Sequence, residues 1–328
     1  MRRSPRICVF APAPVLTVTI EHGSDRPDIH VHAGGQGFWV ARLAATLGAD
    51  VILCCALGGE PGRVLSSLVP SESLSLRAAD ARTANGVYIH DRRTGERLEV
   101  AAADSRPLSR HASDELYGIA LGAGLDADLT VVAGCQPPDV VEPDLYRRLV
   151  SDLRANGTPA IADLTGAPLD ATLQGGVELL KLSHEELVAG GYAAGDRPSD
   201  LIDGARRLQA AGADNVVITR AGAPAILLDD RPDPRPVELV VPRFEALDPR
   251  GTGDSMMAAT AAALARGSDV PGALRLGMAA GALNATRHRL GTGTRHEIER
   301  LAAHVIARRC DAQDVGHEDP AGVPASGA

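Results

Sequence analysis

Aromatic residues are scarce in this chain of 328 residues, at 2%, and lysine occurs once, at Lys181. The other basic side chains are arginines, a bias typical of a GC-rich genome rather than of a function. Long apolar runs are missing as well. None reaches the length of a membrane span, and no signal-peptide apolar region follows the first six residues. We therefore expect no membrane association and a cytoplasmic location.

The chain has more acidic than basic side chains. The formal net charge is -9 and the pI about 5.6, which argues against a nucleic-acid partner. The five cysteines are odd in number and lack Cys-x-x-Cys spacing, so we expect reduced, mostly buried thiols. His296 and His304 do not have the spacing of a zinc protease, which excludes that class of metal hydrolase.

The most informative stretch joins two glycines and a carboxylate where a loop enters a helix. It consists of Gly251, Thr252, Gly253 and Asp254. Residues 255–266 after it are strong helix formers. Glycine lets the backbone approach a ligand closely, and the free N–H groups of a first helical turn bind anions. A carboxylate beside such an anion hole can accept the proton of an attacking hydroxyl, which indicates a kinase. The simpler alternative is an ordinary loop in which Asp254 caps the helix.

Apolar strand-like runs alternate with alanine- and leucine-rich helical runs from about residue 38 to 308. The predicted strands are 7–10, 51–57, 129–133, 159–163, 179–182, 215–219 and 225–228. The predicted helices include 39–47, 144–156, 201–211, 254–266, 272–286 and 296–307. Because the strands are continuously apolar, they predict a mostly parallel sheet with helices on both faces, a three-layer α/β/α domain.

Two segments near residues 16–32 and 86–100 show the period-two alternation of strands outside the main sheet. Residues 92–96 between the later strands form a hairpin turn with a glycine. These segments predict a small antiparallel β lid. One domain is expected over residues 1–308, and the composition of residues 309–328 predicts a disordered tail.

With these segments in place, the chain resembles the ribokinase-like (PfkB) carbohydrate kinases, nearest the phosphofructokinase and tagatose-phosphate kinase branch. Segments in the family's order carry the resemblance, namely 33–42, 132–138, 163–166, 181–187 and 248–254. The likeness runs from about residue 7 to 301, so it implies the ribokinase-like fold. It also implies an ATP- and Mg²⁺-dependent transfer of the γ-phosphoryl group to a hydroxyl of a sugar or sugar-like acceptor.

The resemblance further implies roles for particular residues. Asp254 would be the catalytic base, and the amides of residues 251–253 the anion hole. Glu186 would help to organise Mg²⁺ through water. The residues expected near the nucleotide are Lys181, Ser183, Glu186, Thr219, Gly222, Asn284 and Gly291. The residues expected near the acceptor are Gly34, Gly35, Gln36, Trp39, Arg82 and Asn85.

Three positions that hold the acceptor in the family carry different residues here. Val15 replaces an aspartate, Trp39 an asparagine and Ala84 an arginine, although a shift of one or two residues lets Arg82 serve. Lost charge-assisted bonds weaken binding of a sugar phosphate, so we expect poor activity on a fructose phosphate and better activity on a less charged ring alcohol. Trp39 either stacks on that ring or fills the core, and both interpretations stay open.

Two functions of different classes follow from this pattern. An active kinase is favoured by the intact segment 251–254 and by Glu186. A non-catalytic ligand-binding or regulatory protein is favoured by the lost acceptor contacts and by the altered segment 221–224. We expect the kinase. Lids of the family often pair between two subunits, and open strand edges attract partners, so we also expect a homodimer through residues 16–32 and 86–100.

Overall fold

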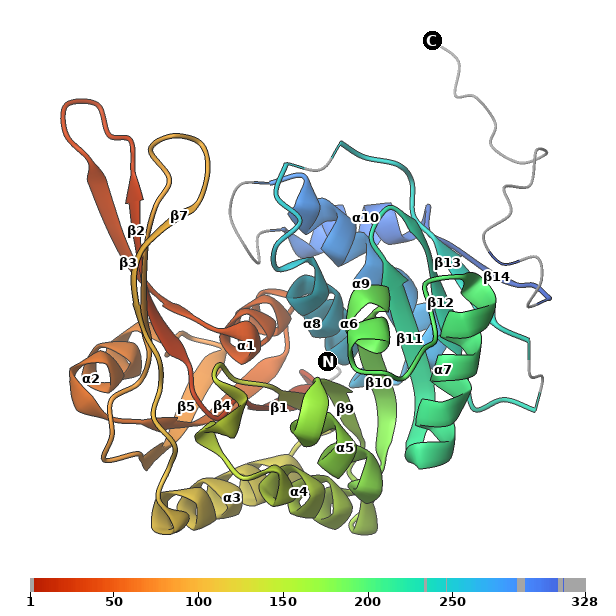
Figure 1. Cartoon of the computed structure of the whole chain (residues 1–328), viewed down its shortest axis with the longest axis horizontal. Coiled ribbons are helices and arrows are strands. Elements are labelled where there is room, and N and C mark those ends of the chain that lie inside the picture. Colours follow the sequence, from red (N-terminus) through yellow and green to blue (C-terminus); the bar gives the residue numbers. More distant parts are fainter. Residues whose placement is uncertain (1–2, 233–234, 246, 288–292, 312–314, 316–328) are drawn as a thin grey trace.

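The computed structural model describes residues 3–232, 235–245, 247–287, 293–311 and 315 (Figure 1). Its large sheet has the strand order β14-β13-β12-β11-β10-β9-β8-β1-β4-β5. These strands are β1 (Arg6–Phe10), β4 (Asp50–Leu57), β5 (Leu74–Asp80), β8 (Leu129–Ala133), β9 (Ala160–Asp163), β10 (Val177–Ser183), β11 (Ala213–Arg220), β12 (Ala223–Leu228), β13 (Val237–Val240) and β14 (Ile306–Arg309). The strands from β5 to β11 are parallel, and β12, β13 and β14 are antiparallel additions at one edge.

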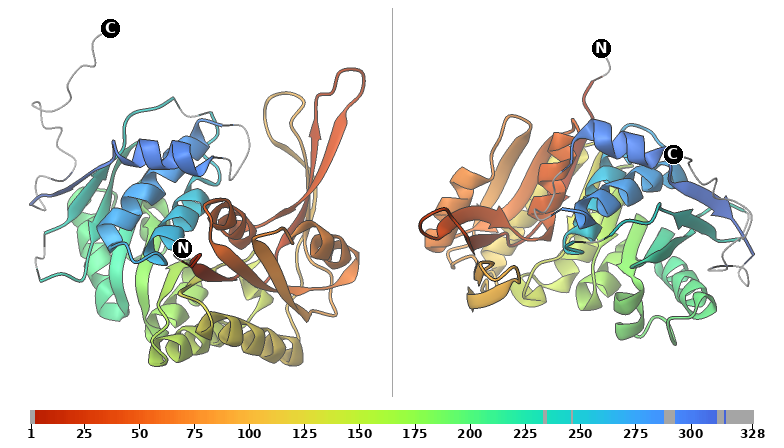
Figure 2. Two further views of the ribbon diagram at one scale, coloured as in Figure 1. Left: turned by 180° about the vertical axis from the view of Figure 1, so that it is seen from behind. Right: turned by 90° about the horizontal axis from the view of Figure 1, so that it is seen from above.

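Helices cover both faces of this sheet (Figures 1 and 2). One face packs against α1 (Gln36–Thr46), α2 (Gly59–Leu68), α8 (Thr252–Leu264), α9 (Val270–Ala285) and α10 (Arg295–Ala302). The other packs against α3 (Arg110–Leu125), α4 (Pro143–Ala155), α5 (Gly166–Gly175), α6 (His184–Ala189) and α7 (Pro198–Ala211). The central strands are buried on both faces, as their apolar sequences require. The predicted three-layer α/β/α domain is confirmed.

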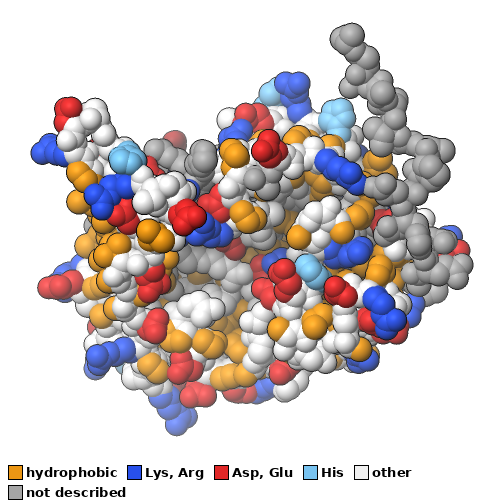
Figure 3. Space-filling model, turned by 45° about the horizontal axis from the view of Figure 1, so that its top comes forward, with side chains coloured by type: hydrophobic (Ala, Val, Ile, Leu, Met, Phe, Trp, Pro, Cys, Tyr) orange, Lys and Arg blue, Asp and Glu red, His pale blue; other side chains and the backbone are white. Residues whose placement is uncertain are grey.

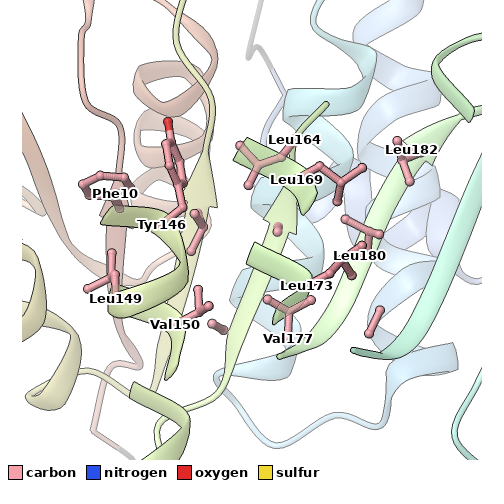
Figure 4. Close-up of a cluster of buried hydrophobic side chains, with 14 of the residues drawn as sticks. Phe10, Tyr146, Leu149, Val150, Leu164, Leu169, Leu173, Val177, Leu180 and Leu182 are labelled. Carbon is pink, nitrogen blue, oxygen red and sulfur yellow. The ribbon is translucent and has the colours of Figure 1, made fainter. Parts of the chain in front are cut away.

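The core beneath α4 and α5 is made of aliphatic side chains around one aromatic pair (Figure 4). The rings of Phe10 and Tyr146 meet edge to face, with centroids 5.4 Å apart. Three thiols, those of Cys8, Cys54 and Cys55, are buried, and those of Cys135 and Cys310 are half-buried. This agrees with the expectation of mostly buried thiols, and their reduced state stays a prediction.

A second, four-stranded sheet stands away from the large one as a lid (Figures 1 and 2). It has the order β3-β2-β6-β7, with β2 (Val15–Glu21), β3 (Asp28–Gly34), β6 (Val87–Asp91) and β7 (Leu98–Ala103). The two hairpins are antiparallel inside, but β2 and β6, which join them, run parallel. The lid is therefore mixed, not wholly antiparallel as predicted, because the sequence shows each hairpin but not how two distant hairpins pair.

The C-terminal elements differ from the sequence prediction. A helix was expected over 296–307, but α10 ends at Ala302 and β14 begins at Ile306, where it pairs with β13. Cys310 extends this edge, since its N–H donates to the Pro236 carbonyl at 3.2 Å. A four-residue edge strand has too few residues for its periodicity to be read. Most of the expected tail, residues 312–314 and 316–328, lies outside the described residues.

Candidate active site

The carboxyl ends of the parallel strands converge on a cavity of about 570 Å³, the usual place for a ligand site in an open α/β sheet. Asp163 ends β9 and Ser183 ends β10, next to Thr219 near the end of β11. The start of α8 approaches the same edge and brings Asp254 to the cavity wall. Residues far apart in the sequence therefore meet at one edge of the sheet.

The loop before α8 presents backbone N–H groups at the helix start. Gly251 caps the helix with φ 69°, a left-handed conformation that glycine adopts without strain. Among the described residues, the N–H groups of Gly253 and Asp254 meet no acceptor, whereas that of Thr252 lies 3.4 Å from the Pro249 carbonyl. Two free N–H groups at the positive end of a helix dipole can bind an anion such as a transferring phosphoryl group.

Asp254 is buried in a way that suits a general base. Burial raises the pKa of its carboxyl group to about 7, and the negative charge of Asp163 raises it further in the same direction. The ammonium group of Lys181 lowers it, but by less. A carboxylate with a pKa near neutrality can hold a proton in one step and release it in the next.

Lys181 lies under the start of α8 and neutralises part of the acidic cluster. Its Nζ is 3.1 and 3.2 Å from the two carboxylate oxygens of Asp163 and 4.0 Å from Oε2 of Glu186. A side chain added at Gly253 would lie 2.8 Å from this Nζ, so the glycine lets the helix approach the ammonium group. This packing places the ammonium group beside the start of α8, and the position of Lys181 near the nucleotide phosphates stays a prediction.

Ser183 and Glu186 form a capping box at the start of α6. The Ser183 N–H donates to Oε2 of Glu186 at 2.7 Å, and the Glu186 N–H donates to the Ser183 hydroxyl at 3.1 Å. The box fixes the Glu186 carboxylate at the cavity, which it lines. Ser183 therefore acts here on the position of Glu186, a role its sequence motif did not indicate.

The carboxylates of Asp163, Glu186 and Asp254 line the cavity around one ammonium group. No group of three His, Cys, Asp or Glu side chains is close enough to hold a metal by itself among the described residues. Mg²⁺ usually takes one or two carboxylates and completes its shell with water and substrate phosphates. The donor set therefore fits a water-bridged Mg²⁺ with Glu186 as its protein contact.

The residues expected near the acceptor divide into two groups. Gly35 and Gln36 line the cavity, with Gly35 at φ 95° and Gln36 Oε1 accepting the Gly134 N–H at 2.9 Å. Gly34 precedes them at the end of β3 and is buried. Val15 also lines the cavity, so the position that lacks the expected aspartate does face the ligand space.

Trp39, Arg82 and Asn85 do not line the cavity. The Trp39 ring packs against Phe38, with centroids 5.2 Å apart, and lies 5.5 Å from the Arg42 guanidinium. Of the two open interpretations of Trp39, this placement favours packing. Arg82 is exposed, at φ 54°.

Asn85 is buried and bonded to the backbone. Its Nδ2 donates to the carbonyls of Pro14 and Ala56, and its Oδ1 accepts the Gly58 N–H at 2.8 Å. The amide thus joins three chain segments at the base of the lid.

Of the described residues expected near the nucleotide, Asn284 is the one that bonds to the loop before α8. Thr219 neighbours Ser183 across the sheet, and Gly222 lies in the turn between β11 and β12. Asn284 on α9 is buried, and its Nδ2 donates to the Arg250 carbonyl at 2.7 Å, which holds the loop in place. Gly291 lies outside the described residues.

Asp163 lies in the site, but it was not predicted from the sequence as a site residue. Asp163 was noted only as part of a turn segment, yet it pairs with Lys181 and raises the pKa of Asp254. A signal existed, because an aspartate that ends a buried strand needs a partner and the chain has one lysine.

Comparisons with known proteins agree with this geometry. The model of the family described as "pfkB family carbohydrate kinase" matches residues 16–297. The ATP-dependent 6-phosphofructokinase isozyme 2 of Escherichia coli strain K12 is 29% identical over 255 residues, which covers 76% of this chain and 80% of that protein. The isozyme 2 of Mycobacterium tuberculosis strain H37Rv is 29% identical over 310 residues, covering 90% and 89%.

Solved structures show the same fold. Escherichia coli phosphofructokinase-2 in complex with potassium superposes with a TM-score of 0.79 at 24% identity, covering 91% of this chain and 98% of that one. Another structure of that enzyme is described as its tetrameric inhibited form. None of the helices in the described part of this chain is long and apolar enough to cross a membrane.

Proposed function

The chain belongs to the pfkB family of carbohydrate kinases, and on this basis we propose that it transfers the γ-phosphoryl group of ATP to a hydroxyl of a sugar phosphate. It is a phosphotransferase with an alcohol group as acceptor. The comparisons thus favour the active kinase over the non-catalytic binding protein. The observation that carries the detailed proposal is the buried carboxylate of Asp254 beside the free N–H groups of α8.

Each part of the site has a task in this reaction. Asp254 accepts the proton of the acceptor hydroxyl as the oxygen bonds to the γ-phosphorus and the bond to ADP breaks. The N–H groups at the start of α8 stabilise the charge on the transferring group, which is the largest contribution in phosphoryl transfer. Lys181 lies close enough to stabilise the same charge.

Bound Mg²⁺ would neutralise phosphate charge and orient the nucleotide, with Glu186 as its protein contact. The proposal places the nucleotide near Thr219, which lies opposite Ser183 in the sheet, near Gly222 in the next turn, and near Asn284, which bonds to the loop before α8. Gly34, Gly35 and Gln36, with Val15, would border the acceptor.

The relatives favour a sugar phosphate as the acceptor. Both curated relatives are named for a fructose phosphate, which weighs against the less charged acceptor expected from Val15, Trp39 and Ala84. Trp39 and Ala84 are absent from the cavity wall, so their identity says less about the acceptor than their sequence positions suggested.

A turnover screen tests the proposal. ADP formation is measured with Mg²⁺ and ATP against sugars, sugar phosphates and nucleosides, and hydrolysis without acceptor is subtracted. We expect acceptor-dependent ADP formation, highest with a hexose phosphate. Folded protein that binds ATP but phosphorylates no member of the panel would instead support the non-catalytic alternative.

A further inference from the structure

Three arginines meet where the lid approaches the loop before α8. Arg92 follows β6 and Arg97 precedes β7, while Arg250 directly precedes the anion hole. An Nη of Arg92 lies 3.6 Å from the Asp248 carboxylate, which also accepts from Arg250 Nε at 3.0 Å. Figure 3 shows basic and acidic side chains gathered where the two parts of the molecule meet. This contact ties the lid to the loop that carries the phosphoryl-binding amides.

Arg97 is the member of this cluster that lacks an acidic partner. No carboxylate lies within ion-pair distance of it among the described residues, and its Nε is buried without a hydrogen-bond acceptor. Its guanidinium stacks on the Tyr88 ring, 4.9 Å from the centroid, so its position is fixed. Burial lowers its pKa, and the charges of Arg250 and Arg92 act in the same direction.

His90 lies in the same part of the lid, close enough to feel the charges of Arg97 and Arg92. Burial lowers its pKa to about 4, with further lowering by Arg97 and Arg92. Its Nε2 lies 3.2 Å from the Thr19 hydroxyl, within the lid sheet. The imidazole is therefore neutral at pH 7, and the guanidinium groups alone carry the charge of the cluster.

A half-buried guanidinium held beside two others is costly unless an anion joins them. We propose that Arg97, together with Arg92 and Arg250, forms the subsite for the phosphate group that the acceptor already carries. The inference rests on the proposed function, because it assigns the non-reacting end of the same acceptor.

The charge of Arg97 fits this ligand. Its guanidinium has no carboxylate within ion-pair distance among the described residues, so it can take a phosphate monoester, whose charge is about -2. Guanidinium forks bind such groups through paired hydrogen bonds. Asp248 lies three positions before Gly251, so the carboxylate that pairs with Arg92 and Arg250 belongs to the loop that leads into α8.

The nucleotide could supply the same chemistry, since its phosphates also lie near Arg250 in the proposed reaction. The two possible sources of the phosphate group differ in whether loss of the cluster weakens binding of the sugar phosphate or of ATP. An acceptor subsite on the lid governs the KM of the sugar phosphate and leaves ATP binding unchanged. A nucleotide subsite does the reverse.

The test compares Arg97→Gln with Arg93→Gln in the full chain. Arg93 is an exposed lid arginine in the turn after β6 and pairs with Asp91, the last residue of that strand, so its variant controls for loss of charge from the lid. Binding of fructose 6-phosphate, fructose and ATP is measured by calorimetry, and KM and kcat by ADP formation. For Arg97→Gln we expect affinity for fructose 6-phosphate to fall about 10- to 100-fold, the effect of one charge-assisted bond.

Fructose and ATP affinities should change less than about twofold, and Arg93→Gln should match the wild type in all assays. Weaker ATP binding in Arg97→Gln would reassign the cluster to the nucleotide and overturn the inference. Equal loss in both variants, or a wild type that binds fructose no more weakly than fructose 6-phosphate, would overturn it too. Calorimetry distinguishes failure of this inference from failure of the proposed function, because it measures binding of fructose 6-phosphate even in a protein that does not turn over.

Discussion

In the proposed reaction, the buried side chain of Asp254 would set the pH dependence. Its carboxyl group is removed from water, so the charged form is disfavoured, and the neighbouring Asp163 adds repulsion. Lys181 offsets part of both effects. A folded-state pKa of about 7 means that the base is deprotonated above this pH and protonated below it. Activity that depends on the base is thus present at high pH and lost as the pH falls through 7.

We predict that kcat/KM falls about tenfold per pH unit below about 7 and is flat above it. Asp163→Asn removes the nearby negative charge, so its acid limb should lie at lower pH than that of the wild type. Substrate phosphates titrate equally in both proteins, so the difference between the two profiles reports the enzyme. Superimposable profiles would show that Asp163 does not act on the base.

The sequence predicted a glycine-containing loop that enters a helix at residues 251–254, because this feature is continuous in the chain, and the structure has it. It did not predict the ion pair of Asp163 with Lys181, because the two residues lie on neighbouring strands whose pairing is a property of the sheet. It also placed Trp39 and Asn85 at the acceptor, whereas neither lines the cavity. A position in a motif shows that a residue is near a site, not which way its side chain turns.

At the scale of the elements, Asn85 helps to fix how the lid is attached to the large sheet. Its amide makes three hydrogen bonds to the backbone of the segments after β1, at the end of β4 and before α2. The two bonds that Nδ2 donates are buried and the one that Oδ1 accepts is partly buried, and a buried backbone group left without a partner is costly. The orientation in which the lid leaves the large sheet is therefore fixed partly by this one side chain.

We predict that Asn85→Ala lowers the free energy of unfolding by about 2–4 kcal/mol, since it leaves buried backbone groups without partners. Amide hydrogen exchange should also speed up in β2 and β6 more than in the large sheet. Thr83→Ala, which removes a hydroxyl with one weak bond at 3.4 Å, is the matched control and should change little. Unchanged exchange in the lid of Asn85→Ala would contradict the role given to it.

Element prediction from the sequence succeeded for the strands from β1 to β12 that are buried in the large sheet, and it missed the edge strands β5 and β14 and the short buried strand β13. The central strands were found because both faces are apolar over their whole length. The edge strands β5 and β14 were missed because half of their positions or more meet solvent and their apolar pattern is broken. The parallel pairing of β2 with β6 was missed because register between distant hairpins is decided by the base of the lid.

At the scale of the whole molecule, the lid offers a surface for a second copy of the chain. Its outer strands expose apolar side chains, namely Ile29 at 66%, Val31 at 47%, Leu98 at 49% and Val100 at 58%. Each pair lies two positions apart on its strand and so faces one side of the sheet. Both β3 and β7 are edge strands, which attract partners.

We predict a homodimer through the lid, with a mass twice the 34.0 kDa of one chain. The double variant Ile29→Glu with Val31→Glu should be monomeric, because charge replaces the apolar contact. Leu125→Glu changes a similarly exposed apolar residue at the end of α3 and should stay dimeric. Light scattering at micromolar concentration measures the masses, and a monomeric wild type would refute the prediction.

The central claim is that Asp254 accepts the proton of the acceptor hydroxyl at the start of α8. The most direct test is Asp254→Asn, which keeps the size of the side chain and removes the base. ADP formation with the best acceptor and ATP affinity by calorimetry are measured on the same protein. The account predicts turnover lowered by about 10²-fold or more with ATP affinity nearly unchanged. Turnover close to that of the wild type would remove Asp254 from the mechanism.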